Sequence, residues 1–371
     1  MTINNRLWSA KVRNLTPYVP GEQPKQDNLC KLNTNENPFP PSPAVKTAIT
    51  QVLGEDSDVL RLYPEPESDS LRDEIVRYYG QFYPNLSRDH VFVGNGSDEV
   101  LALIFSCFFV KDRPILMPDI SYSFYPVYAQ AYSITTQSIP LKADFSIDTD
   151  DYRIPCGGII LANPNAPTGI LLGLDKIRKL ASEHPNSVIV IDEAYIDYAD
   201  EPQGASAIAL IAECDNVIVT QTFSKSRSLA GMRVGMAFAC PSLIAGLTTL
   251  KNSFNSYPLD RVAQAAAMAS IADGEYFEEK RLAVIHLRNK LERSLTGLGF
   301  EVLPSATNFL FAKPVHKSLS AKEIADKLRE KGVIVRHFDK PRIKDYLRIT
   351  VGTSEQHIRL IQCLQEIMWF S

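Results

Sequence analysis

The sequence lacks a long hydrophobic run, a closely spaced cysteine pair and an excess of charge of one sign. Its longest apolar run, residues 100–110, is shorter than the roughly 20 residues of a membrane helix and indicates a buried one. The six cysteines are scattered, so we expect buried free thiols and a cytoplasmic protein. With a net charge of −4, we expect neither nucleic acid nor a membrane as a partner.

Two further absences concern metals and targeting. The six histidines show no metal-ligand spacing, so we expect no metal site. The first thirty residues contain Lys11, Arg13, Glu22 and Lys25 but no apolar segment, so we expect no signal peptide. The chain does have 371 residues, 45% of them hydrophobic and 22% charged, which is ordinary for a globular protein with a large core and two domains.

Between residues 90 and 240, short apolar segments alternate with stretches that have helical patterns. Six segments are continuously apolar and rich in β-branched residues, which is typical of strands buried on both faces of a parallel sheet. They are residues 91–94, 114–117, 158–162, 188–191, 217–221 and 234–239. We therefore expect an α/β fold with a mostly parallel central sheet flanked by helices.

The pattern changes after Pro258. A long helical stretch follows, with a break expected near Asp273 and Gly274 and an end at Gly297 or Gly299. Beyond it, predicted strands (307–312, 333–336, 346–351) interleave with predicted helices (320–331, 354–367), which indicates a smaller α/β domain. We expect an N-terminal arm that packs with the small domain (1–40), a large domain (41–255), and a small C-terminal domain that includes the linking helix (256–371).

Five of the predicted strands end in polar residues. Ligands of open parallel sheets bind beyond the carboxyl ends of the strands, so these five ends predict one pocket. The polar ends are residues 94–98, Asp119 with Tyr122, residues 163–169, residues 192–195 and residues 222–225.

The first of these ends predicts an anion site. Gly94 and Gly96 allow the backbone to approach a ligand closely, and Ser97 and Asp98 begin a helix whose N-terminus offers free N–H groups. The pattern also resembles a dinucleotide fingerprint, but Glu99 stands where the third glycine would be. We therefore favour a phosphate site.

The other strand ends bring a carboxylate and a lysine. Asp192 ends a buried strand, where an unpaired carboxylate costs several kcal/mol, so it needs a cationic partner, and Lys225 is the nearest amine. Tyr122 and Tyr195 offer an aromatic face and a phenol. Together these groups predict pyridoxal 5'-phosphate, whose ring nitrogen pairs with an aspartate and whose aldehyde binds a lysine. The side chains expected to complete its phosphate site are Thr222, Ser224 and Arg233.

The motifs around these residues resemble those of fold-type-I pyridoxal-phosphate aminotransferases, and more narrowly the histidinol-phosphate aminotransferase family. The similarity spans nearly the whole chain. Eight motifs occur in the family's order: NLTPYVPG (14–21), KLNTNENPFPPSP (31–43), RLYPEPES (61–68), VGNGSDEV (93–100), NPNAPTG (163–169), IDEAY (191–195), TFSKSRSLAGMRVG (222–235) and YLRITVG (346–352).

The resemblance implies a role for each matching residue. Lys225 links to the cofactor and moves the proton of the reaction, Asp192 binds the ring nitrogen, and Tyr195 binds the ring hydroxyl. Tyr122 stacks on the ring, and Arg348 binds the substrate carboxylate. The residues implied around the cofactor phosphate are Gly96, Ser97, Asp98, Thr222, Ser224, Arg233 and, from the second subunit of a homodimer, Tyr63. Those implied on the distal side of the substrate are Tyr18 and Arg336.

One position departs from the family's pattern. Ala166 stands where the family usually has an asparagine that contacts the ring hydroxyl, immediately before Pro-Thr-Gly. Either Asn165 or Asn163 substitutes for it, or Tyr195 acts alone.

The implied activity is reversible transamination in histidine biosynthesis, in which histidinol phosphate and 2-oxoglutarate give imidazole-acetol phosphate and glutamate. The expected partners are thus a small-molecule amino donor and keto acceptor. An aromatic amino-acid aminotransferase and a threonine-phosphate decarboxylase of the same scaffold are the alternatives. A cofactor-binding regulator would need a DNA-binding module and a basic excess, and the sequence shows neither.

Overall fold

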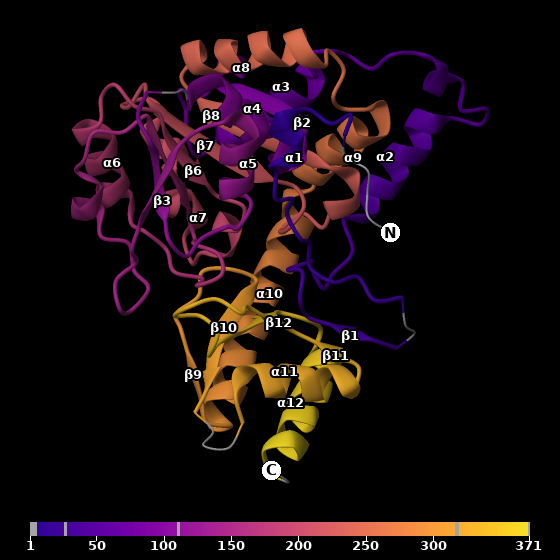
Figure 1. The fold of residues 1–371 in the computed structure, drawn as a ribbon. Coiled ribbons are helices and arrows are strands. Elements are labelled where there is room, and N and C mark those ends of the chain that lie inside the picture. Colours follow the sequence, from indigo (N-terminus) through magenta and orange to yellow (C-terminus); the bar gives the residue numbers. More distant parts are fainter. Residues whose placement is uncertain (1–5, 26–27, 110–111, 316–318, 370–371) are drawn as a thin grey trace.

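The chain forms a larger unit around a seven-stranded sheet and a smaller unit around a four-stranded sheet (Figure 1). The structure, a computed structural model, describes residues 6–25, 28–109, 112–315 and 319–369. Helix α10 (Gly274–Gly297) runs from the larger unit into the smaller one.

The central sheet has the strand order β2-β8-β7-β6-β5-β3-β4. Six strands run in one direction, and β8 is antiparallel to both of its neighbours. The bounds are β2 Val91–Asn95, β3 Ile115–Pro118, β4 Thr136–Ile139, β5 Gly158–Ala162, β6 Ile189–Asp192, β7 Val217–Thr222 and β8 Val234–Ala239. The mostly parallel sheet predicted from the sequence is confirmed.

Helices cover both faces of this sheet because its central strands are apolar on both sides. Along β5, Ile159 and Leu161 pack into one core, while Ile160 and Ala162 pack into the other. The first core is closed by α2 (Pro43–Leu53), α3 (Asp69–Tyr79), α6 (Leu174–Glu183) and α9 (Arg261–Ala272). The second is closed by α4 (Gly96–Phe108), α5 (Tyr125–Tyr132) and α8 (Pro241–Phe254).

The smaller unit is an antiparallel sheet of order β12-β13-β10-β9, covered by helices. Its elements are β9 Phe300–Val302, β10 Phe309–Pro314, α11 Ala321–Glu330, β12 Arg336–His337, β13 Leu347–Thr350 and α12 Ser354–Trp369. A strand from the start of the chain, β1 (Cys30–Lys31), pairs in parallel with β11 (Val333–Ile334), so the N-terminal segment lies along this unit (Figure 1).

The linking helix breaks where the sequence predicts. Helix α9 ends at Ala272, and the Asp273 side chain accepts a hydrogen bond from the backbone N–H of Tyr276 to begin α10. The domain boundary predicted at residue 256 assigns α9 to the smaller domain. In the structure, α9 packs against α2 and α3 of the larger unit. The chain then crosses to the smaller unit along α10 (Figure 1). The division into an arm and two domains stays a prediction.

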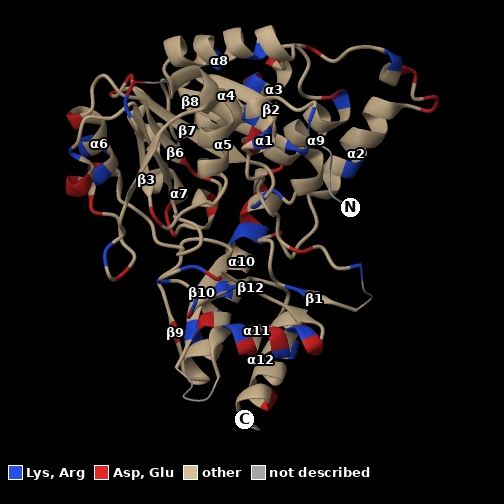
Figure 2. Cartoon of the chain, viewed as in Figure 1, with Lys and Arg blue, Asp and Glu red and all other residues tan. Residues whose placement is uncertain are grey.

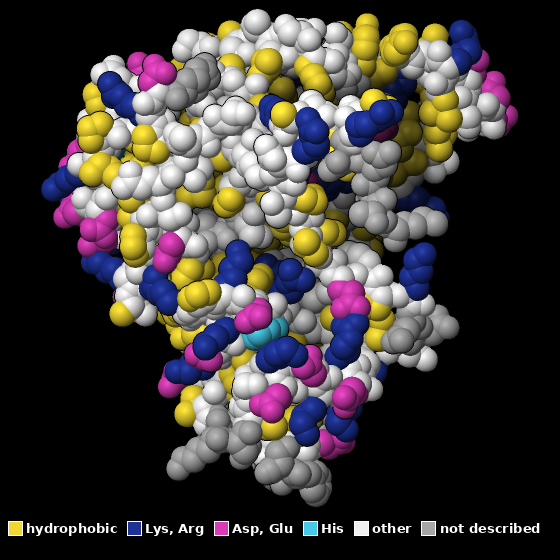
Figure 3. Space-filling model, viewed as in Figure 1, with side chains coloured by type: hydrophobic (Ala, Val, Ile, Leu, Met, Phe, Trp, Pro, Cys, Tyr) yellow, Lys and Arg dark blue, Asp and Glu magenta, His cyan; other side chains and the backbone are white. Residues whose placement is uncertain are grey.

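The surface carries charges of both signs. Both basic and acidic side chains occur along α6 and α11 (Figure 2), and both signs are interspersed on the face shown in Figure 3. In the part of the chain that the structure describes, none of the helices has the length and apolar character of a membrane span.

Candidate active site

The polar strand ends predicted to form one pocket meet at a cavity of about 290 Å³. It lies at the carboxyl edge of β5, β6 and β7, between the central sheet and the β12-β13 pair of the smaller unit. The residues proposed from the sequence that line it are Tyr18, Ser97, Asp98, Tyr122, Asp192, Tyr195, Thr222, Ser224, Lys225, Arg233, Arg336 and Arg348.

One end of the cavity is the N-terminus of α4. Gly96 has a φ of +77°, and a Cβ atom there would lie 2.5 Å from Arg233 Nη2. Strand β8 lies equally close to this helix end, since a Cβ at Gly235 would lie 2.3 Å from the backbone nitrogen of Ser97. These contacts explain both glycines: they let β8 and Arg233 approach the first turn of α4, whose N–H groups are free to bind an anion.

Hydroxyl and guanidinium groups surround this helix end. The Oγ1 of Thr222 donates to the Oγ of Ser224 at 3.0 Å, and Arg233 Nη2 donates to Asp98 Oδ2 at 2.9 Å. Tyr122 also donates to Asp98, at 3.3 Å. N–H groups, hydroxyls and a guanidinium around one point are the donors that a phosphate group needs.

Asp192, at the end of β6, is buried and held by neutral donors. The hydroxyl of Tyr125 donates to its Oδ2 at 2.7 Å, and that of Thr220 donates to its Oδ1 at 3.1 Å. Burial raises the pKa of Asp192 to about 6, although both hydrogen bonds lower it. The expected cationic partner is not Lys225, whose Nζ instead donates to the backbone carbonyl of Thr34 at 3.3 Å. In the protein alone, hydroxyl groups stabilise the carboxylate, and the pairing of Asp192 with a cofactor nitrogen stays a prediction.

Two residues near Lys225 went unnoticed in the sequence. Asn37 donates from Nδ2 to the backbone carbonyl of Lys225 at 3.1 Å, which fixes the turn after β7. Asn35 donates from Nδ2 to the hydroxyl of Tyr195 at 2.9 Å. The Lys225 amine lies 5.8 Å from the centre of the Tyr195 ring. Both asparagines belong to the NTNENP motif, which was noted only as part of the resemblance.

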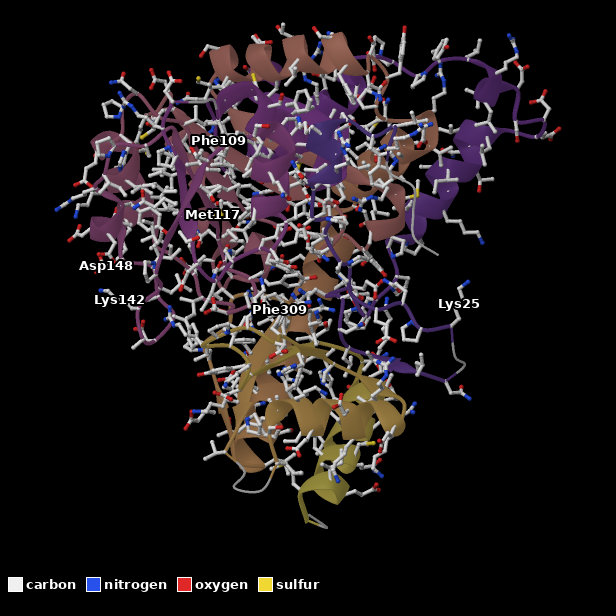
Figure 4. All side chains as sticks on the ribbon, viewed as in Figure 1. Lys25, Phe109, Met117, Lys142, Asp148 and Phe309 are labelled. Atoms are coloured by element: carbon white, nitrogen blue, oxygen red, sulfur yellow. The ribbon has the colours of Figure 1, made fainter. Side chains whose placement is uncertain are left out.

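The other end of the cavity holds two arginines. Arg336 on β12 lies opposite Arg348 on β13. The guanidinium of Arg348 lies 5.3 Å from the ring centre of Phe309 and 5.5 Å from that of Phe338, and its Nη2 donates to the carbonyl of Asn33 at 2.9 Å. Phe309 marks the junction of the two units (Figure 4). The Nε of Arg348 is buried without a hydrogen-bond partner among the described residues, and the residue lines the cavity, so its positive charge is available to an anionic ligand.

The N-terminal segment reaches over this cavity. The Tyr18 ring lies 4.7 Å from that of Phe124 and 6.3 Å from that of Tyr122. The segment is anchored on α5, where Gln130 Oε1 accepts from the backbone N–H of Thr16 at 2.9 Å. Tyr18 is thereby placed beside the proposed stacking tyrosine.

Besides Gly96, which packs against Arg233, two proposed residues do not line the cavity. Asn165 is buried behind it and donates to the carbonyl of Ile120 at 3.0 Å and to Thr168 Oγ1 at 3.1 Å, while Ala166 lines the cavity instead. Tyr63 is 77% exposed and stacks on Tyr257, with 4.7 Å between ring centres. Within one chain, neither residue lies where a ligand of this cavity would contact it.

Comparison with known proteins places this arrangement in a family. Residues 27–364 match the family model described as "Aminotransferase class I and II". Histidinol-phosphate aminotransferase 2 of Psychrobacter arcticus is 63% identical over 370 residues, covering 98% of this chain and 96% of that protein. Histidinol-phosphate aminotransferase of Acinetobacter baumannii is 56% identical over 365 residues, covering 98% of both chains.

A solved structure agrees with these matches. Histidinol-phosphate aminotransferase from Sinorhizobium meliloti, in complex with pyridoxal-5'-phosphate, superposes with a TM-score of 0.82 at 25% identity, covering 92% of this chain and 91% of that one. The resemblance inferred from the eight sequence motifs is therefore confirmed. The chain belongs to the class I and II aminotransferase family.

Proposed function

We propose that the chain is a pyridoxal-phosphate-dependent histidinol-phosphate aminotransferase of histidine biosynthesis, acting in the cytoplasm. It converts histidinol phosphate and 2-oxoglutarate reversibly into imidazole-acetol phosphate and glutamate. The observation that carries the proposal is a single cavity with anion-binding groups at both ends and a buried carboxylate on its wall.

The residues present fit the cofactor. Because Gly96 lacks a Cβ, Arg233 can lie against the α4 N-terminus. Asp192 is buried and accepts hydrogen bonds from neutral donors, so it can pair with a cationic ring nitrogen. When bound, pyridoxal phosphate supplies the ring that accepts electrons from the reacting carbon. The residues that would hold its phosphate are Gly96, Ser97, Asp98, Thr222, Ser224 and Arg233. Asp192 would hold its nitrogen, Tyr195 its hydroxyl, and Tyr122 one face of its ring.

The chemical step falls to Lys225. Its amine lies 5.8 Å from the centre of the Tyr195 ring. A neutral amine there can take a proton from the substrate's Cα and pass it to the C4' atom of the cofactor. Removing such a base typically costs about 100- to 10,000-fold in rate. The rigid turn after β7, fixed by Asn37, holds this amine in place.

Substrate binding falls to the two arginines. Glutamate carries two carboxylates and histidinol phosphate carries a phosphate, so the distal end of the cavity must accept anions of two shapes. The planar guanidinium of Arg348 pairs with a carboxylate in a fixed geometry, and Arg336 adds a second positive charge opposite it. Tyr18, from the N-terminal segment, adds an aromatic surface beside Tyr122.

The working unit is a homodimer. Exposed apolar side chains lie around the Tyr63–Tyr257 stack, which is unusual for a surface that faces water. They are Leu60, Leu62, Tyr63, Phe254 and Tyr257. A second copy packed on this surface would cover these side chains and would bring Tyr63 toward the partner's phosphate site.

Turnover of three amino donors with 2-oxoglutarate tests the substrate. We expect kcat/KM for histidinol phosphate to exceed that for phenylalanine and tyrosine by about 100-fold or more, because the arginine-lined end of the cavity would receive no phosphate from either aromatic donor. A preference for phenylalanine would instead identify an aromatic amino-acid aminotransferase. Release of CO₂ from threonine phosphate would identify a decarboxylase.

A further inference from the structure

Segment 33–37, the sequence NTNEN, forms hydrogen bonds with three residues that line the cavity: Arg348, Lys225 and Tyr195. The carbonyl of Asn33 accepts from Arg348, the carbonyl of Thr34 accepts from Lys225 Nζ, and the side chain of Asn37 holds the backbone of Lys225. Asn35, between them, is 1% exposed and bridges the larger unit to the smaller one. Its side chain therefore has a position from which it can influence the site.

The hydrogen bonds of Asn35 determine which way its amide points. The Oγ1 of Thr350 accepts from the backbone N–H of Asn35 at 3.0 Å, so the single hydroxyl proton of Thr350 is free to be donated. It is donated to Asn35 Oδ1, also at 3.0 Å. The amide oxygen thus faces Thr350, and the amide NH₂ must face Tyr195, whose hydroxyl oxygen lies 2.9 Å from Nδ2.

This orientation has a consequence for Tyr195. A phenol has one proton to donate, and here its oxygen already accepts an N–H from Asn35. The proton of Tyr195 must then point away from Asn35, and Tyr195 lines the cavity. Donation into the cavity is the arrangement that would stabilise a deprotonated ring hydroxyl of the cofactor.

We propose that Asn35 is a positioning residue that directs the hydroxyl proton of Tyr195 into the cavity and ties it to β13, the strand that carries Arg348. The proposal rests on the proposed function, since it needs the cofactor's ring hydroxyl beside Tyr195. The proposal gives a role to Asn35, the second asparagine of the NTNENP motif.

The backbone around Asn35 suits asparagine. Its φ of +57° lies in the left-handed region, which asparagine tolerates better than most residues. Asn308 Nδ2 donates to the carbonyl of Asn35 at 2.9 Å, so the main chain is held independently of the side chain. A change confined to the side-chain amide should therefore alter the hydrogen bond to Tyr195 and leave the segment in place.

The test is Asn35→Asp, which keeps the shape but replaces the donor to Tyr195 with an acceptor. The readout is the pH at which the absorbance band of the bound cofactor changes between its acidic and alkaline forms. If Tyr195 turns its proton to the introduced carboxylate, the ring hydroxyl loses a donor and this pH rises by about one unit. The same substitution in a Tyr195→Phe background should give a much smaller rise, because no phenol remains to be redirected.

The controls separate this effect from charge and from folding. Asn216→Asp makes the same change at the opposite edge of the sheet, where Asn216 donates to the carbonyl of His184, and should leave the transition pH unchanged. Two further substitutions introduce no charge. Thr350→Val removes the hydroxyl that orients the Asn35 amide, and Thr350→Ser keeps it. We expect a rise for valine and none for serine.

Three results would overturn the proposal: no rise for Asn35→Asp, an equal rise in both Tyr195 backgrounds, or identical behaviour of the two Thr350 variants. Failure of the proposed function is distinct from all three. In that case, the wild-type protein would show no cofactor absorbance band when mixed with pyridoxal phosphate.

Discussion

The hydroxyl of Tyr125 donates to Asp192 Oδ2 across 2.7 Å, between two side chains that are both buried. Tyr125 lies on α5 and Asp192 at the end of β6, so this bond joins a helix of one sheet face to the strand end that faces the cavity. It is one of the hydrogen bonds that hold down the pKa of Asp192, which burial raises to about 6. The bond therefore keeps a buried carboxylate ionised near neutral pH.

Removing this bond should weaken cofactor binding. In Tyr125→Phe the pKa of Asp192 rises further, so at pH 7 a larger share of the carboxyl is protonated and cannot pair with a cationic ring nitrogen. A hydrogen bond to a charged group contributes about 1.5–3 kcal/mol, so we expect the Kd for pyridoxal phosphate at pH 7 to rise about tenfold or more. The increase should shrink toward pH 9, where the carboxyl ionises again.

Fluorescence titration of the apoprotein with pyridoxal phosphate at several pH values measures this effect. Tyr152→Phe is the matched control, because the Tyr152 hydroxyl is buried without a hydrogen-bond partner among the described residues. If Tyr125→Phe bound the cofactor as tightly as this control at every pH, Tyr125 would have no part in ionising Asp192.

Arg348 should be required for both substrates. Arg348→Met removes the planar pair of donors between Phe309 and Phe338, and a charge-assisted pair of hydrogen bonds contributes about 3 kcal/mol, so kcat/KM should fall by about 100-fold or more for both glutamate and histidinol phosphate. Arg348→Lys should recover little, because a lysine cannot reproduce the fork. Steady-state kinetics with each donor provides the measurement.

The control for that series is Arg329→Met, which breaks a surface ion pair with Glu22 outside the cavity and should leave kcat/KM unchanged. A loss confined to one of the two donors would show that Arg348 binds either the carboxylate of glutamate or the phosphate of histidinol phosphate, but not both.

The exposed apolar surface around Tyr63 predicts a dimer that a single charge disrupts. Phe254 is 81% exposed at the end of α8, and Phe254→Asp would place a carboxylate in the proposed interface, where its desolvation costs several kcal/mol. We expect the wild type to sediment as a dimer and Phe254→Asp to dissociate at micromolar concentration. Cofactor binding should weaken with it, because Tyr63 would no longer reach the partner's site.

Leu282→Asp offers a comparison, since Leu282 is an exposed apolar residue on α10 rather than in this surface. It should remain dimeric. A monomeric wild type that binds pyridoxal phosphate tightly would contradict the assignment of Tyr63 to a neighbouring phosphate site.

The sequence predicts those parts of the fold that depend on local pattern. The continuous apolar runs locate six strands of the central sheet, because strands buried on both faces need such runs. Strand β4 was missed because three of its four residues are exposed, so its composition does not differ from that of a loop. Strand β9, with three residues, is too short to show a pattern.

The candidate site was also only partly predictable from the sequence. Asp192 and Lys225 are visible in the sequence because a charged residue at the end of an apolar strand is a local signal. Tyr125 and Asn35 gave no such signal. Their partners, Asp192 and Tyr195, lie 67 and 160 positions away, and the pairs form only when α5 and the N-terminal segment pack on the sheet edge. Thr220, which donates to Asp192, offered a hint because it is a polar residue inside a buried strand.

The surroundings of His357 allow us to predict how the stability of the smaller unit depends on pH. Its Nε2 accepts a hydrogen bond from the backbone N–H of Gly352 at 2.9 Å, which requires that nitrogen to be unprotonated. Burial lowers the pKa of His357 to about 4 from an ordinary value of 6.5. The folded state therefore binds the proton less readily than the unfolded state. The contribution of neutral His357 to the free energy of unfolding is fully present above pH 6.5 and is lost as the pH falls toward 4.

The expected loss is about 2 kcal/mol between pH 7 and pH 5, since each pKa unit corresponds to about 1.4 kcal/mol. Urea unfolding of the wild type and of His357→Gln at both pH values isolates this contribution. Glutamine can still accept from Gly352 but does not titrate, so the free energy of unfolding of the variant should fall less between the two pH values. Equal pH dependence in the two proteins would mean that His357 takes up its proton in the folded state, and that the Gly352 hydrogen bond does not exclude it.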